Sequence, residues 1–268
     1  MLQTWEECIS YIKQDVLCQE VKGTHVNASY KGHSLFIFIL SVINILFGIL
    51  FTYLYYSLYE TKLAYDSSGS YSVFLPEGSI NFYIQIEDFY QSHLRNSRSI
   101  SHKQLEGKKD VESKKTSPLD YENDIPIYPA GILSNTFFQD TFEIPKIDIE
   151  TDDISWSSNI KNAGYQRNEV VPPPLWEGYR EIPKLYENKR YVNWIYNAPY
   201  YSFRKLWGKI EVLESGNYML NIESVSKFEK KSVVFSQTCW AGNKNYFLSS
   251  SMIVVGIVGL LVSLAMYL

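Results

Sequence analysis

Two long stretches without a charged residue constrain this chain more than any other feature of its sequence. They cover residues 35–59 and residues 246–268. Each is long enough to cross a bilayer core of roughly 30 Å as a helix that rises about 1.5 Å per residue. A buried core helix rarely needs so many consecutive apolar residues, and the first stretch starts too late and runs too long for a cleaved signal peptide. The sequence therefore predicts two transmembrane helices, because only helices and closed barrels satisfy the backbone polar groups inside a membrane.

Two spans place both ends of the chain on the same side of the membrane. Tyrosines gather where the first stretch meets the middle of the chain, as in an interfacial aromatic belt: they are Tyr53, Tyr55, Tyr56 and Tyr59. The lysines of the N-terminal tail, residues 1–34, are offset by acidic residues, so the positive-inside rule gives no orientation. We expect a cytosolic tail and a luminal or extracellular segment over residues 60–245, because a signal anchor followed by a terminal span usually delivers a bulky segment there.

The segment between the spans reads as a β-rich domain. Apolar and polar residues alternate over residues 80–87 and 216–223, and a β-branched run follows at residues 233–235. Prolines interrupt much of the remainder and exclude long helices. We therefore expect an antiparallel, sandwich-like arrangement of strands with long connections, and a short helix after Asp88.

Two connections differ from the rest in composition. Residues 101–124 carry many charges of both signs and few large apolar side chains, so we expect an exposed loop there. Three prolines at residues 172–174 favour an extended segment, which either reaches across a neighbouring protein or is a plain surface connection.

Composition and motifs exclude several function classes. Hydrophobic residues make up 46% of the chain, too many for a disordered protein, and the formal net charge of −4 gives no basis for a nucleic-acid partner. The histidines show no metal-ligand spacing, and the neighbouring acids Asp152 and Asp153 lack the βα context of sugar-nucleotide enzymes. Because the chain also has no phosphate-binding loop, nucleophile elbow or dinucleotide fingerprint, we expect no enzyme activity, no metal and no cofactor.

The spans themselves carry little polar chemistry. Asn44 is the most polar residue deep in the first span, and neither span contains an ionisable group that would mark an ion path. Gly48, Gly256 and Gly259 offer small surfaces that either pack on a helix of another protein or face lipid.

Cysteine usage predicts no disulfide within the middle segment. Cys8 and Cys18 lie in the tail, and only Cys239 lies between the spans. The one Asn-x-Ser/Thr sequence begins at Asn27 in the tail, so we expect no glycosylation of the middle segment either.

Residues 128–142, YPAGILSNTFFQDTF, resemble a signature of the CDC-fifty family, also called ligand-effect modulator three. That signature reads Tyr-Pro-Cys-Gly, then Asn, then Phe-Asn-Asp-Thr-Phe. Residues 81–107, 193–210 and 230–256 resemble further family stretches in the same order. The family consists of accessory β-subunits of lipid-flipping P-type ATPases.

The resemblance implies a two-span anchor with a β-rich, lumen-facing domain that caps a multi-span ATPase. Such a subunit assists the exit of its partner from the endoplasmic reticulum and supports phospholipid transport, while the partner hydrolyses ATP. The implied location is the membrane of the endoplasmic reticulum, the Golgi or endosomes, or the plasma membrane, in contact with membrane lipids and with both termini cytosolic.

The resemblance also marks residues for the scaffold or the partner interface. They are Tyr128, Pro129, Gly131, Asn135, Phe138, Asp140, Thr141, Phe142, Trp194, Phe203, Arg204, Lys205, Leu206, Trp240, Gly242, Lys244 and Asn245. Of these, Phe138 and Phe142 are expected in a buried core rather than at an interface. Asp140 and Thr141 lack the Asp-Lys-Thr-Gly context of an ATPase phosphorylation site.

The sequence also departs from the family pattern. Ala130 stands where the family has a disulfide cysteine, and each lost disulfide would remove roughly 2 to 5 kcal/mol of stability. We therefore expect the domain to depend on its aromatic core or on its partner. The alternatives are a two-span ion-channel subunit, which shares the topology, and an adhesion or receptor-like membrane protein.

Overall fold

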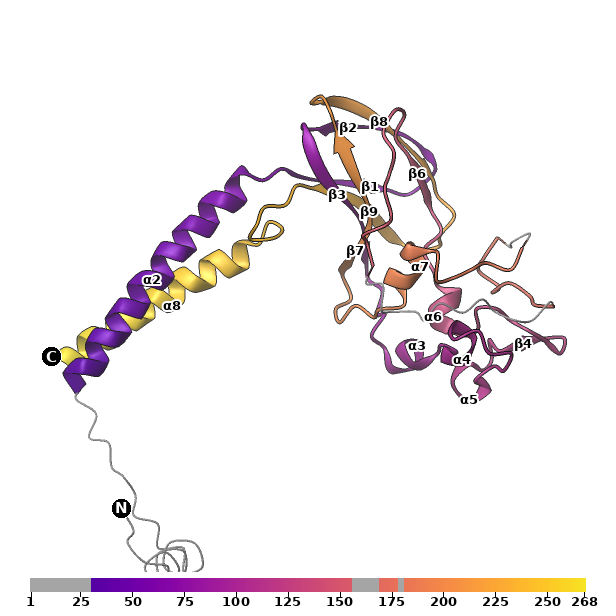
Figure 1. Ribbon diagram of the computed structural model, residues 1–268, viewed down its shortest axis with the longest axis horizontal. Helices are drawn as coiled ribbons and strands as arrows, with labels where there is room; N and C mark the ends of the chain where they lie inside the picture. The colour runs from indigo at the N-terminus through magenta and orange to yellow at the C-terminus, as the bar shows by residue number, and fades with distance from the viewer. Residues whose placement is uncertain (1–29, 156–168, 178–180) are drawn as a thin grey trace, which may run out of the picture. The chain divides into compact units, whose positions relative to one another are not determined.

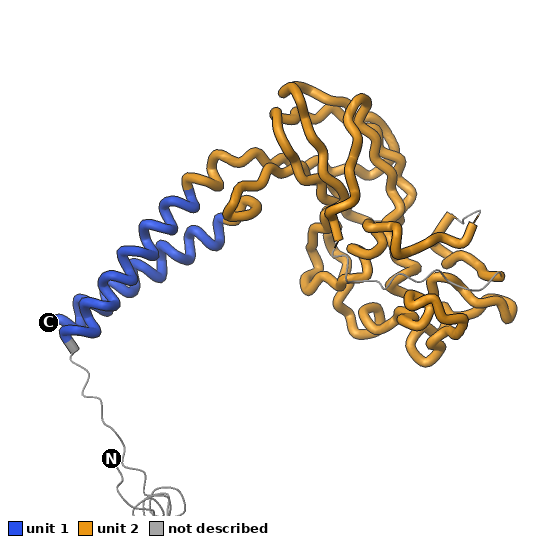
Figure 2. The backbone as a smooth tube through the Cα atoms, in the orientation of Figure 1, with its two compact units in different colours: residues 1–52, 246–268 blue, residues 53–245 orange. Residues whose placement is uncertain are grey.

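The computed structural model describes residues 30–155, 169–177 and 181–268. These residues form two compact units (Figure 2): one holds the residues up to Thr52 together with Tyr246–Leu268, and the other holds Tyr53–Asn245. The first unit is made of two helices, and the second of β-sheets with short helices (Figure 1).

Helices α2 (Tyr30–Ser57) and α8 (Tyr246–Tyr267) confirm that the two uncharged stretches form long apolar helices, of which the first begins at Tyr30 and ends at Ser57 rather than covering residues 35–59. Both are long and apolar enough to cross a membrane. Many of their large side chains are exposed, for example Phe36 at 62% and Leu261 at 63%. Two helices with this much exposed apolar surface need lipid or another apolar surface around them, because water would be an unfavourable solvent for them.

Small residues pack α2 against α8 at intervals of seven. In α2 they are Ser34, Ser41 and Gly48, and in α8 they are Ser249, Gly256 and Ser263, and all are buried. Because seven residues make nearly two helical turns, each set lines one face of its helix. Small side chains on facing stripes let two backbones approach closely in a membrane.

Direct contacts show that this seam joins the two helices of the same chain. Ser34 and Ser263 each donate a hydroxyl hydrogen bond to the other's backbone carbonyl at 2.8 Å. A Cβ atom on Gly48 or Gly256 would lie only 2.6 Å or 2.5 Å from an isoleucine of the opposite helix, and one on Gly259 would meet a serine of α2. The interpretation that these glycines pack on another protein or face lipid is therefore wrong, because the chain's own second helix occupies them.

The second unit contains two antiparallel sheets. The larger has the order β1 (Glu60–Tyr65), β9 (Lys230–Ser236), β3 (Gly78–Glu87) and β7 (Phe203–Val212), and the smaller has the order β2 (Gly69–Leu75), β8 (Gly216–Glu223) and β6 (Thr141–Glu143). The Phe82 ring of β3 lies 5.0 Å from the Phe142 ring of β6, so the sheets share a core. This arrangement confirms the predicted antiparallel, sandwich-like domain (Figure 1).

The strand pattern read from the sequence is correct in the central strands. Ile80, Phe82, Ile84 and Ile86 of β3 are at most 1% exposed, and in β8 Leu220 is fully buried. β3 pairs with β7 on one side and β9 on the other, which leaves no exposed edge along it. Alternation therefore identified the strand at the centre of the larger sheet.

Short helices gather beyond one end of the sheets (Figure 1). They are α3 (Leu94–Arg98), α4 (His102–Leu105), α5 (Ser113–Thr116), α6 (Ile132–Asn135) and α7 (Lys189–Trp194), and β4 (Tyr121–Glu122) pairs with β5 (Ile125–Pro126) among them. The helix expected after Asp88 is present as α3. It begins only at Leu94, whose side chain is exposed.

The prediction of an exposed loop over residues 101–124 is wrong for part of that segment. Gln104 is 1% exposed and Thr116 is fully buried. The Gln104 amide donates to the Ile127 carbonyl at 2.8 Å and accepts from the Ala130 N–H at 2.8 Å. Hydrogen bonds satisfy this buried polar side chain, and Leu105 of the same segment belongs to the hydrophobic core, so the segment packs although it has few large apolar residues.

The helix seam predicts a specific effect of added bulk. With Ser34→Cys and Ser263→Cys in a background where the natural cysteines are serines, oxidation should form an intramolecular disulfide, since the two hydroxyl oxygens lie 3.2 Å apart. Adding Gly256→Leu should reduce this cross-link several-fold, because overpacking a close helix contact costs about 1 to 3 kcal/mol. The matched control is Ala265→Leu on the exposed face of α8. Equal cross-linking in the two variants, measured on non-reducing gels, would contradict the seam.

Candidate functional site

The motif segment at residues 128–142 begins with a turn that only glycine fits. Gly131 has a φ of +107°, and a Cβ atom there would collide with the Ser99 carbonyl. The next N–H, of Ile132, donates to the Ser99 hydroxyl at 2.9 Å. Tyr128 and Pro129, just before the turn, are buried. The turn therefore fixes the start of the motif onto the segment that precedes α4.

The aromatic residues of the motif lie in the core. The Phe138 ring stacks 6.2 Å from Phe142 and lies 5.4 Å from Trp207. Trp194 is fully buried, and Phe203 lies 6.3 Å from it. The expectation that Phe138 and Phe142 belong to the core is confirmed, and the other two rings extend the same cluster.

Asp140 is the centre of a buried hydrogen-bond network. Its carboxylate accepts from the Tyr65 hydroxyl at 2.7 Å, from Lys231 Nζ at 2.7 Å, and from the N–H groups of Val225 and Ser226 at 2.8 and 2.6 Å. The side chains of Lys231 and Asp140 are 3% and 0% exposed. Ion pairs this deep in a protein are stable only when further hydrogen bonds offset the loss of water, and here three donors besides Lys231 supply them to Asp140.

Tyr65 stays neutral in this network. Burial raises the pKa of the Tyr65 phenol, and the negative charge of Asp140, to which it donates, raises it further. The Lys231 ammonium lies 5.1 Å from the centre of the Tyr65 ring, which adds a cation–π contact. With all its neighbours acting as donors and no exposed face, Asp140 is a structural anion and is not accessible as a phosphorylation site.

Three of the other marked residues lie nearer the surface. Thr141 is exposed and donates to Glu223 at 3.0 Å. Arg204 forms an ion pair with Glu60 at 3.1 Å on the outer face of the larger sheet. The third, Leu206, is half-buried. Exposed ion pairs of this kind contribute at most about 1 kcal/mol, so these residues are not the main source of stability.

Lys205 has an unusual environment for a lysine. It is 6% exposed, and its ammonium donates to the carbonyls of Asn193, at 3.1 Å, and Tyr196. These carbonyls lie at the C-terminal end of α7, where a positive charge is favourable. Burial lowers the pKa of Lys205 to about 8. Among the described residues no carboxylate forms an ion pair with it, so its charge is stabilised by these carbonyl dipoles and by the Phe203 ring, whose centre lies 5.9 Å from the ammonium.

The last four marked residues form a separate group in the turn that precedes α8; they are Trp240, Gly242, Lys244 and Asn245. Gly242 has a φ of +95°, which closes the turn. Lys244 Nζ donates to the Leu58 carbonyl at 3.2 Å, and the Tyr55 hydroxyl donates to the Ala241 carbonyl at 3.3 Å. These bonds tie the turn to the C-terminal end of the first apolar stretch.

Large side chains are also exposed on two neighbouring segments of the β-rich unit, residues 90–94 and 196–201. We call the following set the tyrosine surface: Tyr90 (61% exposed), Leu94 (60%), Tyr196 (48%), Tyr200 (72%) and Tyr201 (51%). The rings of Tyr90 and Tyr201 lie 5.8 Å apart, so residues from two distant segments meet here. Clustered exposed aromatic side chains are typical of protein interfaces.

Hydrogen bonds join the two segments that carry the tyrosine surface. The amide of Gln91, fully buried, donates to the Trp194 carbonyl at 2.8 Å and accepts from the Ala198 N–H at 2.9 Å. The Phe89 N–H donates to the Tyr201 carbonyl at 3.1 Å. The surface is therefore fixed in shape before any partner binds.

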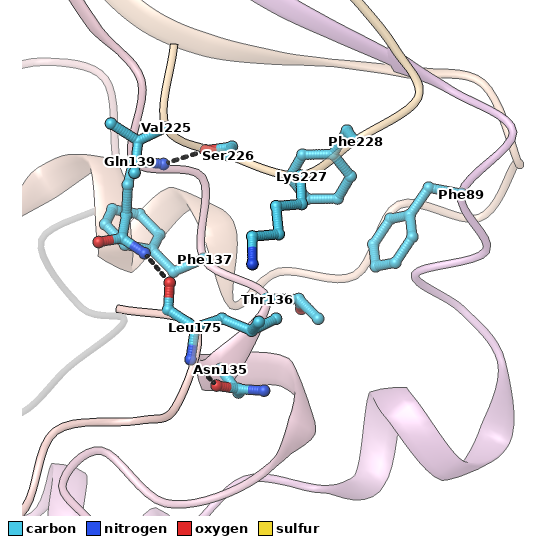
Figure 3. A pocket seen from close by; sticks show the side chains of 10 residues that line it. All are labelled: Phe89, Asn135, Thr136, Phe137, Gln139, Leu175, Val225, Ser226, Lys227 and Phe228. Carbon is cyan, nitrogen blue, oxygen red and sulfur yellow. Dashed lines mark hydrogen bonds between the residues drawn. The ribbon is translucent and has the colours of Figure 1, made fainter. Parts of the chain in front are cut away.

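A pocket of about 150 Å³ lies next to the motif (Figure 3). Its walls are largely apolar, and its lining residues are Phe89, Asn135, Thr136, Phe137, Gln139, Leu175, Val225, Ser226, Lys227 and Phe228. The motif contributes four of them, and the loop after β8 contributes another four. The position of this loop follows from Asp140, which holds the N–H groups of Val225 and Ser226.

Three hydrogen bonds keep the pocket open (Figure 3). Asn135 Oδ1 accepts from the Leu175 N–H at 2.9 Å, and Gln139 Nε2 donates to the Leu175 carbonyl at 3.0 Å. The Gln139 N–H donates to the Ser226 hydroxyl at 2.7 Å. The segment just after the three prolines therefore packs on the motif of its own domain.

Comparison with known proteins finds a family that includes the motif segment and the pocket described above. The family model described as LEM3 (ligand-effect modulator 3) family / CDC50 family matches residues 75–268. This range includes the whole motif cluster, the pocket and the second helix. The chain belongs to the CDC50 family.

Individual CDC50-family relatives show the same relationship. ALA-interacting subunit 3 of Arabidopsis thaliana is 32% identical over 205 residues, which are 69% of this chain and 58% of the relative. Cell cycle control protein 50A of Mus musculus is 28% identical over 233 residues, which are 71% of this chain and 64% of the relative. The phospholipid-transporting ATPase accessory subunit CDC50 of Chaetomium thermophilum is 27% identical over 216 residues, which are 66% of this chain and 53% of the relative. The matched part is less than two thirds of each relative's length.

Membership of the CDC50 family and the two apolar helices make this chain a membrane protein. At the position where the family resemblance implies a cysteine, Ala130 is fully buried, and its N–H is held by Gln104. Within the described residues, Cys239 is a free cysteine, and no group of three or more potential ligands could hold a metal ion.

Several residues that build this CDC50-family site were missed in the sequence. Lys231 is the clearest case, because it shares the inward face of β9 with Val233 and Phe235. A charge on the buried face of a strand requires a partner, so period-two alternation alone contained the signal. Tyr65, Gln91 and the exposed tyrosines had no comparable local signal.

The ion pair predicts a strong and non-additive effect on stability. Asp140→Asn should lower the stability of the domain by about 3 to 5 kcal/mol, because Lys231 would remain buried without its counter-charge. That corresponds to a thermal midpoint lower by roughly 10 °C. Lys231→Met should be similarly harmful, but the double variant should lose clearly less than the sum. Thermal unfolding followed by tryptophan fluorescence in detergent measures this, with Thr141→Val as the exposed control.

Additive effects of Asp140→Asn and Lys231→Met, or an effect of either no larger than that of Thr141→Val, would contradict the role of the pair.

Lys205 predicts a pH dependence of stability with a definite sign. Between about pH 8 and the ordinary lysine pKa of 10.5 the unfolded chain keeps the proton on this lysine while the folded chain loses it. Stability therefore rises with pH in this window, by at most about 1.4 kcal/mol per unit, and the effect vanishes below pH 8, where both states hold the proton. Thermal midpoints from pH 7 to 9.5 should rise for the wild type relative to Lys205→Met. If the thermal midpoints of the wild type and of Lys205→Met change with pH in parallel, the lysine does not titrate in this range. The control is Lys209→Met, because Lys209 is half-exposed.

Proposed function

We propose that this chain is the non-catalytic accessory subunit of a phospholipid-transporting P-type ATPase. The observation that carries the proposal is the family match across residues 75–268, together with a relative in Chaetomium thermophilum, 27% identical over 216 residues, that is named as such a subunit. The partner would hydrolyse ATP and move the lipid, and this chain would support its stability, its exit from the endoplasmic reticulum and its transport cycle.

The geometry supports a binding role in this complex. The buried acids and lysines described above serve the fold, whereas the tyrosine surface is exposed and rigid. Arg95 and Arg98 lie in α3 beside it, and among the described residues neither forms an ion pair. We therefore assign the tyrosine surface to contact with the ATPase, and the marked motif residues to the scaffold that holds this surface and the pocket.

The proposed topology follows from the same assignment. Residues 1–34 would form a cytosolic tail, residues 35–59 and 246–268 would span the membrane, and residues 60–245 would lie in the lumen or outside the cell. The complex would reside in the endoplasmic reticulum, in Golgi or endosomal membranes, or in the plasma membrane. Residues 240–245, with their bonds to residues 55–58, would then lie at the membrane boundary, where Trp and Tyr are favourable.

Co-purification tests the proposal directly. The tagged chain, expressed in its own organism and extracted in mild detergent, should carry a multi-span P-type ATPase in near-equal amount, identified by mass spectrometry. Tyr200→Ser combined with Tyr201→Ser should reduce the recovered ATPase at least about tenfold, because interface aromatic residues commonly contribute 1 to 2 kcal/mol or more each. Tyr121→Ser, which changes an exposed tyrosine outside this surface, is the matched control.

Recovery of the wild-type chain alone under several mild conditions would overturn the proposed function. Full recovery of the ATPase with the double tyrosine variant would instead overturn only the assignment of the surface.

A further inference from the structure

The pocket beside the motif has the chemistry of a binding site for one carboxylate. Three phenylalanine rings line it, and those of Phe89 and Phe228 lie 5.1 Å apart at a steep angle. The Lys227 side chain points into the space between Phe89 and Leu175 (Figure 3). None of the described residues that line the pocket is acidic. An apolar pocket with one cation favours a ligand that has an apolar stem and an anionic end.

Two hydrogen-bond donors in the pocket have no acceptor within the part of the chain that the structure describes. Lys227 forms no ion pair or hydrogen bond with any described residue. Asn135 uses its Oδ1 to accept from Leu175, which turns its amide nitrogen away from that residue (Figure 3). Among the described residues, that nitrogen donates to no acceptor. A carboxylate has two oxygens that can accept from an ammonium and an amide, and charge-assisted bonds of this kind are the stronger ones.

Neighbouring charges leave this pocket positive. Asp140 lies behind the pocket wall, where it holds Val225 and Ser226, but Lys231 already balances its charge. Among the described residues, none forms an ion pair with the Lys227 ammonium. An anion that enters the pocket gains this attraction without displacing an existing partner.

The size of the pocket limits its ligand. Sites for drug-sized molecules and cofactors enclose about 300 to 1,000 Å³, whereas this pocket encloses about 150 Å³. It therefore suits a single side chain rather than a nucleotide or a whole lipid. Phe89 of the pocket precedes Tyr90 in the chain, and its N–H is bonded to the Tyr201 carbonyl, so the pocket adjoins the tyrosine surface.

We propose that this pocket binds a glutamate or aspartate side chain on a loop of the partner protein. The carboxylate would accept from Lys227 and from the Asn135 amide, and the methylene groups would contact the phenylalanine rings. The proposal rests on the proposed function for the source of the acidic side chain, but the pocket chemistry stands on the structure alone. It also gives Asn135, a residue of the family motif, a binding role in addition to its bond with Leu175.

Binding of small probes tests the pocket without any partner. The full chain in detergent is titrated with blocked glutamate, N-acetylglutamate amide, and with the isosteric blocked glutamine, and contact is measured by saturation-transfer NMR. We expect binding of blocked glutamate that is at least about tenfold tighter than that of blocked glutamine, since one charge-assisted bond contributes about 1.5 to 3 kcal/mol. Lys227→Met should abolish this preference, and so should Asn135→Asp, which keeps the acceptor for Leu175 and places a repelling charge in the pocket. Lys184→Met, an exposed lysine that is not part of the lining, is the control.

A parallel titration with phosphocholine tests whether the pocket binds a lipid headgroup instead, because three aromatic rings and a lysine could also hold such a group. Binding of phosphocholine but not of blocked glutamate, or equal binding of blocked glutamate and glutamine, would overturn the proposal. Loss of binding in Lys184→Met as in Lys227→Met would do the same.

Co-purification separates this inference from the proposed function. Lys227→Glu should reduce the ATPase recovered with the tagged chain at least about tenfold, and Lys184→Glu should leave it unchanged. If the wild type recovers an ATPase and Lys227→Glu recovers as much, the pocket inference fails and the proposed function stands. If the wild type recovers none, the proposed function fails, and the glutamate titration still decides the pocket chemistry.

Discussion

The buried ion pair between Asp140 and Lys231 connects the parts of this domain that matter for binding. Asp140 directly precedes β6 of the smaller sheet, and Lys231 lies in β9 of the larger sheet, so the pair joins the two layers. The same carboxylate holds the backbone of Val225 and Ser226, and thereby the loop that carries Lys227. A charge placed this deep is tolerated only because donors surround it, and those donors come from three different strands and loops. The ion pair therefore fixes the family motif, the sheet packing and one wall of the pocket together.

The helical unit is organised by close packing rather than by charge. Its seam of serines and glycines lets α2 and α8 approach within contact of their backbones, and its outer faces remain apolar. In a membrane the lipid tails solvate apolar side chains as well as a neighbouring helix does, so association depends on packing and on a few hydrogen bonds such as those between Ser34 and Ser263. In this chain the two helices therefore form a packed pair whose outward surface remains available to lipid or to a partner.

Much of the fold could be predicted from local patterns. The spans followed from two uncharged stretches, and the central strand β3 followed from strict alternation of four buried residues. The burial of Phe138 and Phe142 was also predicted correctly. Predictions failed where a polar side chain is buried by hydrogen bonds, as at Gln104, or where glycines contact a segment far away in the chain, as in the helix seam. In both cases the partner lies in a segment that local composition does not identify.

The sequence by itself determined the two membrane spans, the strand-rich segment between them and the family, because these depend on periodicity, length and ordered motifs. Only the tertiary structure decided that Asp140 is a structural anion, that Lys227 has no counter-charge among the described residues, and that tyrosines from two distant segments lie side by side. The physical reason is that charge balance and exposure depend on which residues meet across the fold. Lys231 and Asp140 are 91 residues apart in the chain, and no local pattern specifies that contact.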